Sequence, residues 1–299
     1  MNWLSFVLLG HAANALVFLI DKFFLTKTKV FKDPRLYAFL VAVFSLLAFV
    51  VIAPFGLRFL TWENLLMNGL SGALFIVAIV FFFKCLQGAE ASRIVPLIGC
   101  GIPIVTLIIS YLFIGERLGG RQLAAFAVLS LGIILISLSR TKAVISPRLF
   151  SQAFLAILFF ALSAVLAKKA FLTEAYLNAF LWQRLGGALT LVYFVAQSSL
   201  RHDLNKAFGL IFSKIGLVYW SNQLLAAAGF LAINYATSLA SVSLVNALQG
   251  VQYAILFLLA VLASIFYPKI LKESIEKGTL LLKSVAILAI GFGLFLLIS

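Results

Sequence analysis

Two stretches of the sequence decide the fold: Ala91-Ser92-Arg93-Ile94-Val95-Pro96-Leu97 and Ser241-Val242-Ser243-Leu244-Val245-Asn246-Ala247. Each stretch follows one long apolar run and opens another, which extends to Ile114 in the first case and to Tyr267 in the second. Weaker matches keep the same order along the chain, since Leu131-Gly132 resembles Ile290-Gly291. Matches in a shared order predict that the chain consists of two similar halves.

The composition excludes a water-soluble fold. Of the 299 residues, 64% are hydrophobic and 11% are charged, whereas a soluble domain has roughly 25% charged residues. A helix that spans a bilayer needs about 20 mostly apolar residues. The sequence can be cut into ten such runs: Asn2–Leu25, Pro34–Ala53, Trp62–Leu86, Ala91–Ile114, Arg121–Ser139, Phe150–Leu172, Ala175–Ser198, Lys214–Ser238, Ser241–Tyr267 and Thr279–Ile298.

Five spanning helices in each half is an odd number, so the second half must enter the membrane in the opposite orientation to the first. The sequence therefore predicts an all-α integral membrane protein with ten transmembrane helices in two inverted five-helix repeats, residues 1–140 and 150–299. We expect a multi-pass protein of the plasma membrane. Because the number of spans is even, both termini are expected on one side.

The excess of basic residues fits this class of protein. The formal net charge is +14, but Lys and Arg lie between the apolar runs, where they meet lipid headgroups, so no nucleic-acid partner is expected. Most of them follow odd-numbered runs, which favours termini outside the cell. Cys85, Cys100, His11 and His202 show no metal-ligand spacing, so neither a metal nor a cofactor is predicted.

The residues from Glu90 to Leu97, followed by Pro103 and by Gly115-Glu116-Arg117-Leu118, resemble a pattern of the EamA family in the drug/metabolite transporter superfamily. The second half departs from that pattern, because Asn246 and Tyr253 stand in the places of Pro96 and Pro103. The resemblance implies a ten-helix alternating-access carrier for small metabolites, often exported amino acids. It also implies termini inside the cell, opposite to the orientation that the basic residues favour.

Charged residues inside the predicted spans are few. All nine acidic residues lie at predicted helix ends or in loops, which disfavours an exchanger of hydrophobic cations, since such a carrier needs a carboxylate near the midplane. Arg184 lies well inside the seventh run, beside Trp182 and Gln183. It either binds a substrate carboxylate or phosphate, or it caps carbonyl groups or reaches an interface. In the first case an amino acid is the leading substrate by the family resemblance.

Two helix faces are candidates for opposite walls of a central cavity. Both follow a helical spacing of three, four and seven residues, and their members are Ser92, Pro96, Gly99 and Pro103 in the fourth run and Asn246, Gln249 and Tyr253 in the ninth. A proline frees a backbone carbonyl, which a membrane protein tolerates where neighbours or cavity water bind it. The alternative is that Asn246 and Gln249 only join one helix to another.

Further polar residues inside the spans are candidates for the same cavity. His11 and Asn14 share a face of the first run, and Asn222 and Asn234 lie in the eighth. His11 is the only group inside a span that titrates near neutral pH, so it is the candidate for proton coupling. A neutral His11 that forms hydrogen bonds at a helix interface is the alternative.

Secondary transport of a small organic metabolite is the function that these observations predict, and the family resemblance implies that the direction is export. A flippase for a lipid-linked sugar or a similar amphiphile is an alternative, as is a membrane scaffold without transport. An enzyme is disfavoured, because no nucleophile with a base, metal site or carboxylate pair falls inside a span. The expected partners are a small-molecule substrate and membrane lipids, and the oligomeric state stays open.

Overall fold

The computed structural model describes residues 3–27, 33–88, 91–137, 146–197, 200, 214–266 and 277–298. These residues form helices joined by short connections, with no strand among them. The predicted bounds of the runs differ from the observed ones by at most three residues. The elements are α1 (Trp3–Lys27), α2 (Pro34–Ile52), the 3-10 turn η2 (Ala53–Phe55), α3 (Trp62–Gly88), α4 (Ala91–Ile114), α5 (Gly120–Ser137), α6 (Pro147–Thr173), α7 (Tyr176–Ala196), α9 (Lys214–Leu239), α10 (Val242–Ala247), α11 (Gln249–Phe266) and α12 (Lys277–Ile298).

The predicted ninth helix is broken. It was expected as one run from Ser241 to Tyr267, but Leu248 separates the short α10 from α11. Ser241 caps α10, since its hydroxyl oxygen accepts a hydrogen bond of 3.1 Å from the backbone N–H of Leu244. A broken helix at membrane depth is tolerated where protein or cavity water meets the freed backbone groups. One carbonyl of α10, that of Val245, lies 3.3 Å from Nε2 of His11.

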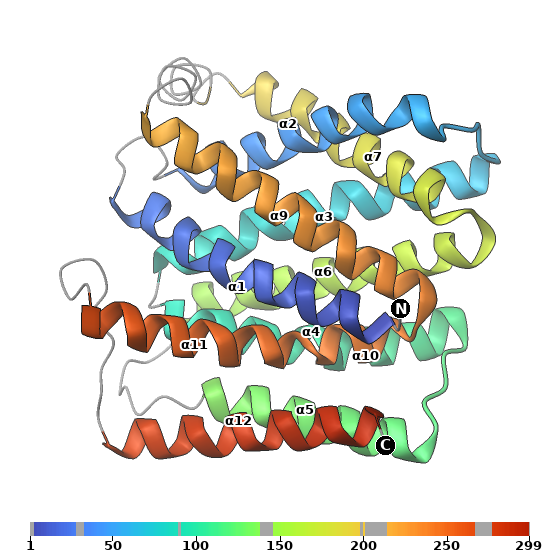
Figure 1. Ribbon diagram of the computed structural model, residues 1–299. Helices are drawn as coiled ribbons and strands as arrows, with labels where there is room; N and C mark the ends of the chain where they lie inside the picture. The colour runs from blue at the N-terminus through green and yellow to red at the C-terminus, as the bar shows by residue number, and fades with distance from the viewer. Residues whose placement is uncertain are drawn as a thin grey trace.

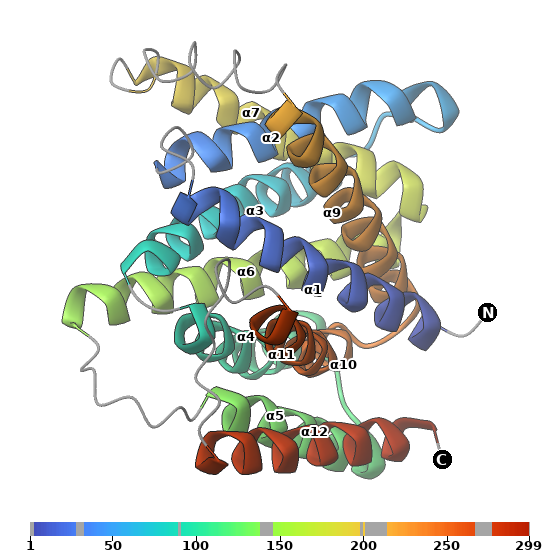
Figure 2. The same cartoon turned by 60° about the vertical axis from the view of Figure 1, so that its left-hand side comes forward.

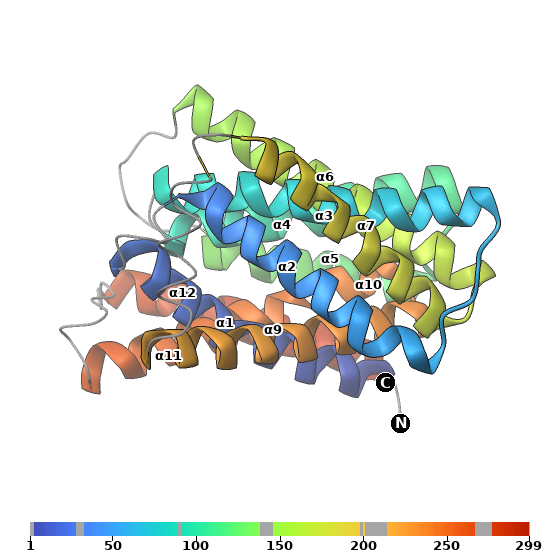
Figure 3. The same ribbon diagram turned by 90° about the horizontal axis from the view of Figure 1, so that it is seen from above.

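The helices lie side by side along one common direction (Figure 1). Each helix of the first half packs against a helix of the second, in the pairs α2 with α7, α3 with α6, α1 with α9, α4 with α10, and α5 with α12. Figure 2 shows α2 and α7 at the top of the bundle and α5 and α12 at the bottom. Helices α1 and α6 run in opposite directions, and the start of α1 lies at the same end of the bundle as the end of α12 (Figures 1 and 3).

The described residues contain nine segments long and apolar enough to cross a membrane. The remaining predicted span lies in α5, whose apolar stretch Gly120–Ile136 has 17 residues. Large apolar side chains such as Leu131 and Leu288 are exposed on the outer faces, whereas the polar Asn68 and Gln183 are buried. This arrangement is the reverse of a soluble protein and is the one expected of a multi-pass membrane protein.

Glycines bring α3 and α7 into close contact. A Cβ atom at Gly72 would overlap the carbonyl oxygen of Gln183, and one at Gly186 would overlap the backbone of Gly69. Small residues at a helix interface let two backbones approach, and van der Waals contact is the main attraction between helices in lipid. This contact fixes the position of the α7 segment that carries Gln183 and Arg184.

Two side chains, one from α6 and one from the connection after α4, form hydrogen bonds to the junction between α9 and α10. Lys168 of α6 donates hydrogen bonds from Nζ to the carbonyl oxygens of Thr237 and Ala240, at 2.9 and 2.8 Å. Glu116, which follows α4, accepts bonds from the backbone N–H of Val242 at 2.9 Å and from the Ser243 hydroxyl at 2.6 Å. A cation at the end of one helix and an anion at the start of the next match the helix dipoles.

Candidate functional site

A cavity of about 290 Å³ lies between the two halves of the bundle. Its described lining comes from α1, α2, α3, α4, α6, α7, α9, α10 and α11, and includes no residue of α5 or α12. The volume is at the lower end of the range for pockets that hold small molecules, about 300–1,000 Å³. Such a cavity suits a compact solute rather than an extended chain.

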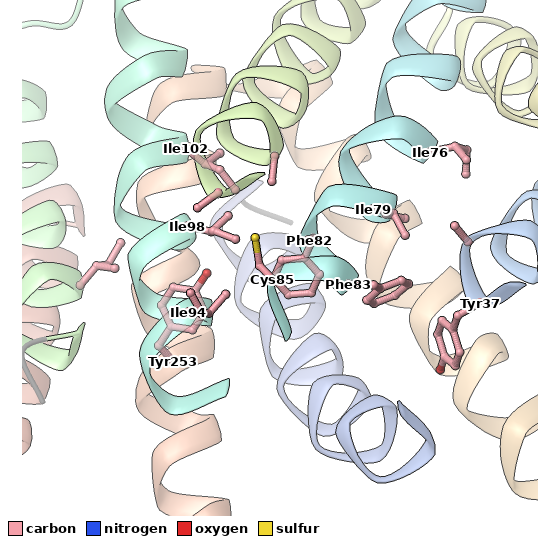
Figure 4. Close-up of a cluster of buried hydrophobic side chains, with 14 of the residues drawn as sticks. Tyr37, Ile76, Ile79, Phe82, Phe83, Cys85, Ile94, Ile98, Ile102 and Tyr253 are labelled. Atoms are coloured by element: carbon pink, nitrogen blue, oxygen red, sulfur yellow. The ribbon is translucent and has the colours of Figure 1, made fainter. Parts of the chain in front are cut away.

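Much of the cavity wall is apolar. Figure 4 shows Ile98 and Ile102 of α4 near Tyr253, with Phe82 and Phe83 of α3 on the neighbouring helix, and all five side chains line the cavity. Because such a wall offers few hydrogen bonds, the few polar side chains that interrupt it determine which solutes can bind.

Arg184 of α7 lines this cavity and is 8% exposed. Its guanidinium carbon Cζ lies 4.2 Å from the ring centre of Phe230, 5.0 Å from that of Phe180 and 5.7 Å from that of Phe75. Its Nε is buried without a hydrogen-bond partner, and no described carboxylate forms an ion pair with it. Aromatic faces stabilise a cation by about 0.5–2 kcal/mol each, but they leave the N–H donors unused.

Gln183, the neighbour of Arg184, also lines the cavity and connects α7 to α3 and α6. Its Nε2 donates to the Ser71 hydroxyl at 3.0 Å, and Ser71 in turn donates to the carbonyl oxygen of Ser163 at 2.8 Å. The side-chain oxygen Oε1 of Gln183 is buried and has no partner among the described residues. A donor from a bound solute can occupy that oxygen.

Asp21 overturns one expectation. It was interpreted as a helix-end residue like the other acids, but its side chain is 8% exposed and lines the cavity from within α1. Its Oδ1 accepts a hydrogen bond from the Tyr37 hydroxyl and another, of 2.7 Å, from Nδ2 of Asn222. Asp21 therefore lies near the end of the apolar span Trp3–Asp21, as predicted, but its carboxyl group is buried in the cavity wall and does not face an interface.

The predicted walls on α4 and on α10 and α11 meet directly. A Cβ at Gly99 would overlap the ring of Tyr253, and Asn246 donates from Nδ2 to the Thr106 hydroxyl of α4 at 3.0 Å. Asn246, Gln249 and Tyr253 line the cavity. Gly99 is covered by the tyrosine ring.

The remaining members of the α4 stripe do not join the described lining. Pro103 is buried in α4 but lies off the cavity, where the preceding residue Ile102 takes its place. Ser92 and Pro96 are part of α4, but their side chains fall outside the described residues.

The candidates of α1 and α9 divide between the cavity and its surroundings. His11, Asn14 and Asn234 line the cavity. His11 lies between helices, with Nδ1 3.1 Å from Oε1 of Gln252 and Nε2 near the carbonyl oxygen of Val245. Asn222 lies off the described lining because it turns toward Asp21.

Trp182 also lies off the cavity. Its ring is beside Phe59, and its Nε1 donates a hydrogen bond of 2.8 Å to the carbonyl oxygen of Arg58. It therefore joins α7 to the connection before α3 and does not contribute to the described lining.

Sequence reasoning missed several side chains of the cavity. Gln252 lines it three residues after Gln249 and had the same polar signal. The three phenylalanines around Arg184 had no signal of their own, because the sequence contains 30 phenylalanines and residue type alone does not distinguish a lining residue from one that faces lipid.

Residues 1–138 match the family model described as the EamA-like transporter family. The first half of this chain is EamA-like. This confirms the resemblance of the first half to the EamA pattern. The match and the nine candidate spans among the described residues are consistent with a multi-pass membrane protein. The matched residues include Asp21, His11 and the α4 stripe, whereas Arg184 and Asn246 lie beyond them.

The fold as a whole resembles a solved structure described as "Crystal structure of protein". The TM-score is 0.63, the sequences are 15% identical, and the comparison covers 98% of this chain and 96% of the other. At this identity the likeness shows a shared arrangement of helices and extends past the EamA-like half. No curated protein matches the sequence.

Proposed function

We propose that the protein is a secondary transporter for a small organic solute that carries a carboxylate or phosphate, with an amino acid as the leading substrate. The observation that carries this proposal is the position of Arg184. Its guanidinium group lines the cavity, its Nε is buried, and it has no ion-pair partner among the described residues.

An uncompensated charge in this position has a cost that a substrate can remove. Placing Arg at the centre of a spanning helix costs about 2.5–3.5 kcal/mol on insertion scales. A carboxylate accepts two parallel hydrogen bonds from a guanidinium, and the low dielectric of the cavity strengthens both. Three aromatic ring centres lie within about 6 Å of the guanidinium carbon, and none of them accepts the N–H donors in the way a carboxylate does.

The carrier is proposed to work by alternating access between two inverted repeats, residues 1–140 and 150–299. Three observations support this. The helices pair across the halves, α1 and α6 run in opposite directions, and the EamA-like match ends at residue 138, near the proposed boundary. A cavity at the interface of two such repeats can open to one side when the repeats rock against each other.

Export is the proposed direction, as the EamA resemblance implies.

The decisive experiment compares a carboxylate with its amide. Purified protein in liposomes is given a panel of amino acids and the corresponding amino-acid amides, and uptake and efflux of each are measured for the wild type and for Arg184→Gln. The expected result is transport of an acid without transport of its amide, and loss of transport in Arg184→Gln at an unchanged melting temperature. Equal transport of acid and amide by the wild type would refute the anion site.

A further inference from the structure

Asp21 is the one carboxyl group among the described residues that line the cavity, and its two oxygen atoms have different surroundings. The Tyr37 hydroxyl and Nδ2 of Asn222 both donate to Oδ1. No described residue donates a hydrogen bond to Oδ2, and none forms an ion pair with this carboxyl group.

This asymmetry suits a carboxyl group that gains and loses a proton. When Oδ2 carries the proton, Oδ1 becomes the carbonyl oxygen and keeps both of its hydrogen bonds. When the proton leaves, the same two donors stabilise the carboxylate. Neither state requires Tyr37 or Asn222 to move, so protonation changes the charge of the cavity without changing its packing.

The groups that face Asp21 do not supply a compensating positive charge. The titratable groups packed around it are the phenols of Tyr37 on α2 and Tyr219 on α9, whose ring centres lie 5.8 Å apart. Phe83 of α3 and Tyr253 of α11 also line the cavity. His11 lies ten residues before Asp21 on α1, and its ring is within hydrogen-bond distance of Gln252. A proton is therefore the simplest source of neutrality for this carboxylate.

Asp21 and Arg184 form no ion pair with each other among the described residues. Asn222 touches Asp21, Phe230 touches Arg184, and the two lie eight residues apart on α9, which is about 12 Å at 1.5 Å per residue. We propose that Asp21 is the proton-binding residue of the cavity, at a site separate from that of the substrate anion at Arg184. Its use in driving transport rests on the proposed function, whereas proton binding itself does not.

The proposed step is a proton transfer. A proton from water on one side of the membrane forms an O–H bond at Oδ2, and that bond breaks when water on the other side takes the proton.

The test needs no substrate. Infrared difference spectra of the purified wild type are recorded between pH 8 and pH 4, and the C=O stretching band of a protonated carboxylic acid is followed. The wild type and Glu63→Gln, which removes an exposed carboxylate outside the cavity, are expected to show a band that Asp21→Asn lacks. Identical band changes in the wild type and Asp21→Asn would overturn the proposal.

Two further arms keep the result interpretable. Tyr37→Phe removes one donor to Oδ1 but keeps the carboxyl group, so the band is expected to remain and to shift in frequency; an unshifted band would contradict the assignment to Asp21. Spectra in sodium chloride and in choline chloride are expected to agree, and a band that sodium abolishes would replace the proton with a metal cation. Because no substrate is present, these results stand apart from the outcome of the carboxylate and amide comparison.

Discussion

The ring of Tyr253 on α11 lies where a side chain at Gly99 of α4 would have to be. The contact joins the two halves at the cavity, since Tyr253 is part of the lining and Gly99 forms the surface on which its ring rests. The Tyr253 ring can occupy its place in the lining only because residue 99 has no side chain.

Gly99→Ala is expected to displace the Tyr253 ring and to lower the stability of the folded protein by about 1–3 kcal/mol, the range for overpacking a buried contact. Thermal unfolding in detergent measures the effect. The double variant Gly99→Ala with Tyr253→Ser removes the ring that the methyl group meets. The fall in melting temperature of the double variant is expected to be smaller than the sum of the falls caused by the two single substitutions. Strict additivity would contradict a direct contact.

A pair of glycines on α3 tests the contact between α3 and α7. Gly72→Ala would place a methyl group on the carbonyl oxygen of Gln183, whereas a Cβ at Gly69 meets nothing within 4 Å. Gly72→Ala is therefore expected to lower the melting temperature and to reduce transport, because Gln183 and Arg184 must move. Gly69→Ala, which has the same intrinsic effect on the helix, is the matched control and should leave both measurements near wild type.

Two adjacent lysines of α6 have different roles. Lys168 donates to carbonyl groups at the end of α9, whereas Lys169 is 44% exposed and lies 3.9 Å from an exposed Glu63. Lys168→Met is expected to cost about 1.5–3 kcal/mol of stability, as for hydrogen bonds that involve a charged group. Lys169→Met should cost less than about 1 kcal/mol, as for a surface ion pair. Equal losses in chemical denaturation would disprove the distinction.

Arg184→Lys distinguishes a general positive charge from a guanidinium fork. The guanidinium carbon of Arg184 lies near three aromatic ring centres, and Lys cannot offer the two parallel donors of a guanidinium group. The affinity for the transported carboxylate is expected to fall roughly tenfold or more, which corresponds to about 1.4 kcal/mol. Binding to the purified variant measures it, and near wild-type affinity would show that charge alone is sufficient.

The sequence predicted the helices well because the signal is simple. Long apolar runs separated by charged residues must span lipid, and Ala91–Ile114 has the same ends in the prediction and in α4. The break at Leu248 was not predicted, because no proline lies there and the polar residues Asn246 and Gln249 were interpreted as a wall of the cavity. Next to the break, Nε2 of His11 lies 3.3 Å from the carbonyl oxygen of Val245, a contact between residues far apart in the sequence.

The site was harder to predict because it depends on which way each side chain points. Asp21 lies four residues before the end of its predicted run, so its position in the sequence indicated an interface. Its burial depends on Asn222, 201 residues away along the chain. For Arg184, in contrast, the cost of a charge inside a span predicted a protected position before its neighbours were known.

The gap at Leu248 divides one wall of the cavity into two mechanical parts. Glu116 accepts two hydrogen bonds from the start of the short α10, while Tyr253 packs the longer α11 against Gly99 of α4. Leu248 alone separates the two helices, and the hydrogen bond of Asn246 to Thr106 also holds α10. Substitutions can therefore loosen the two parts of this wall independently of each other.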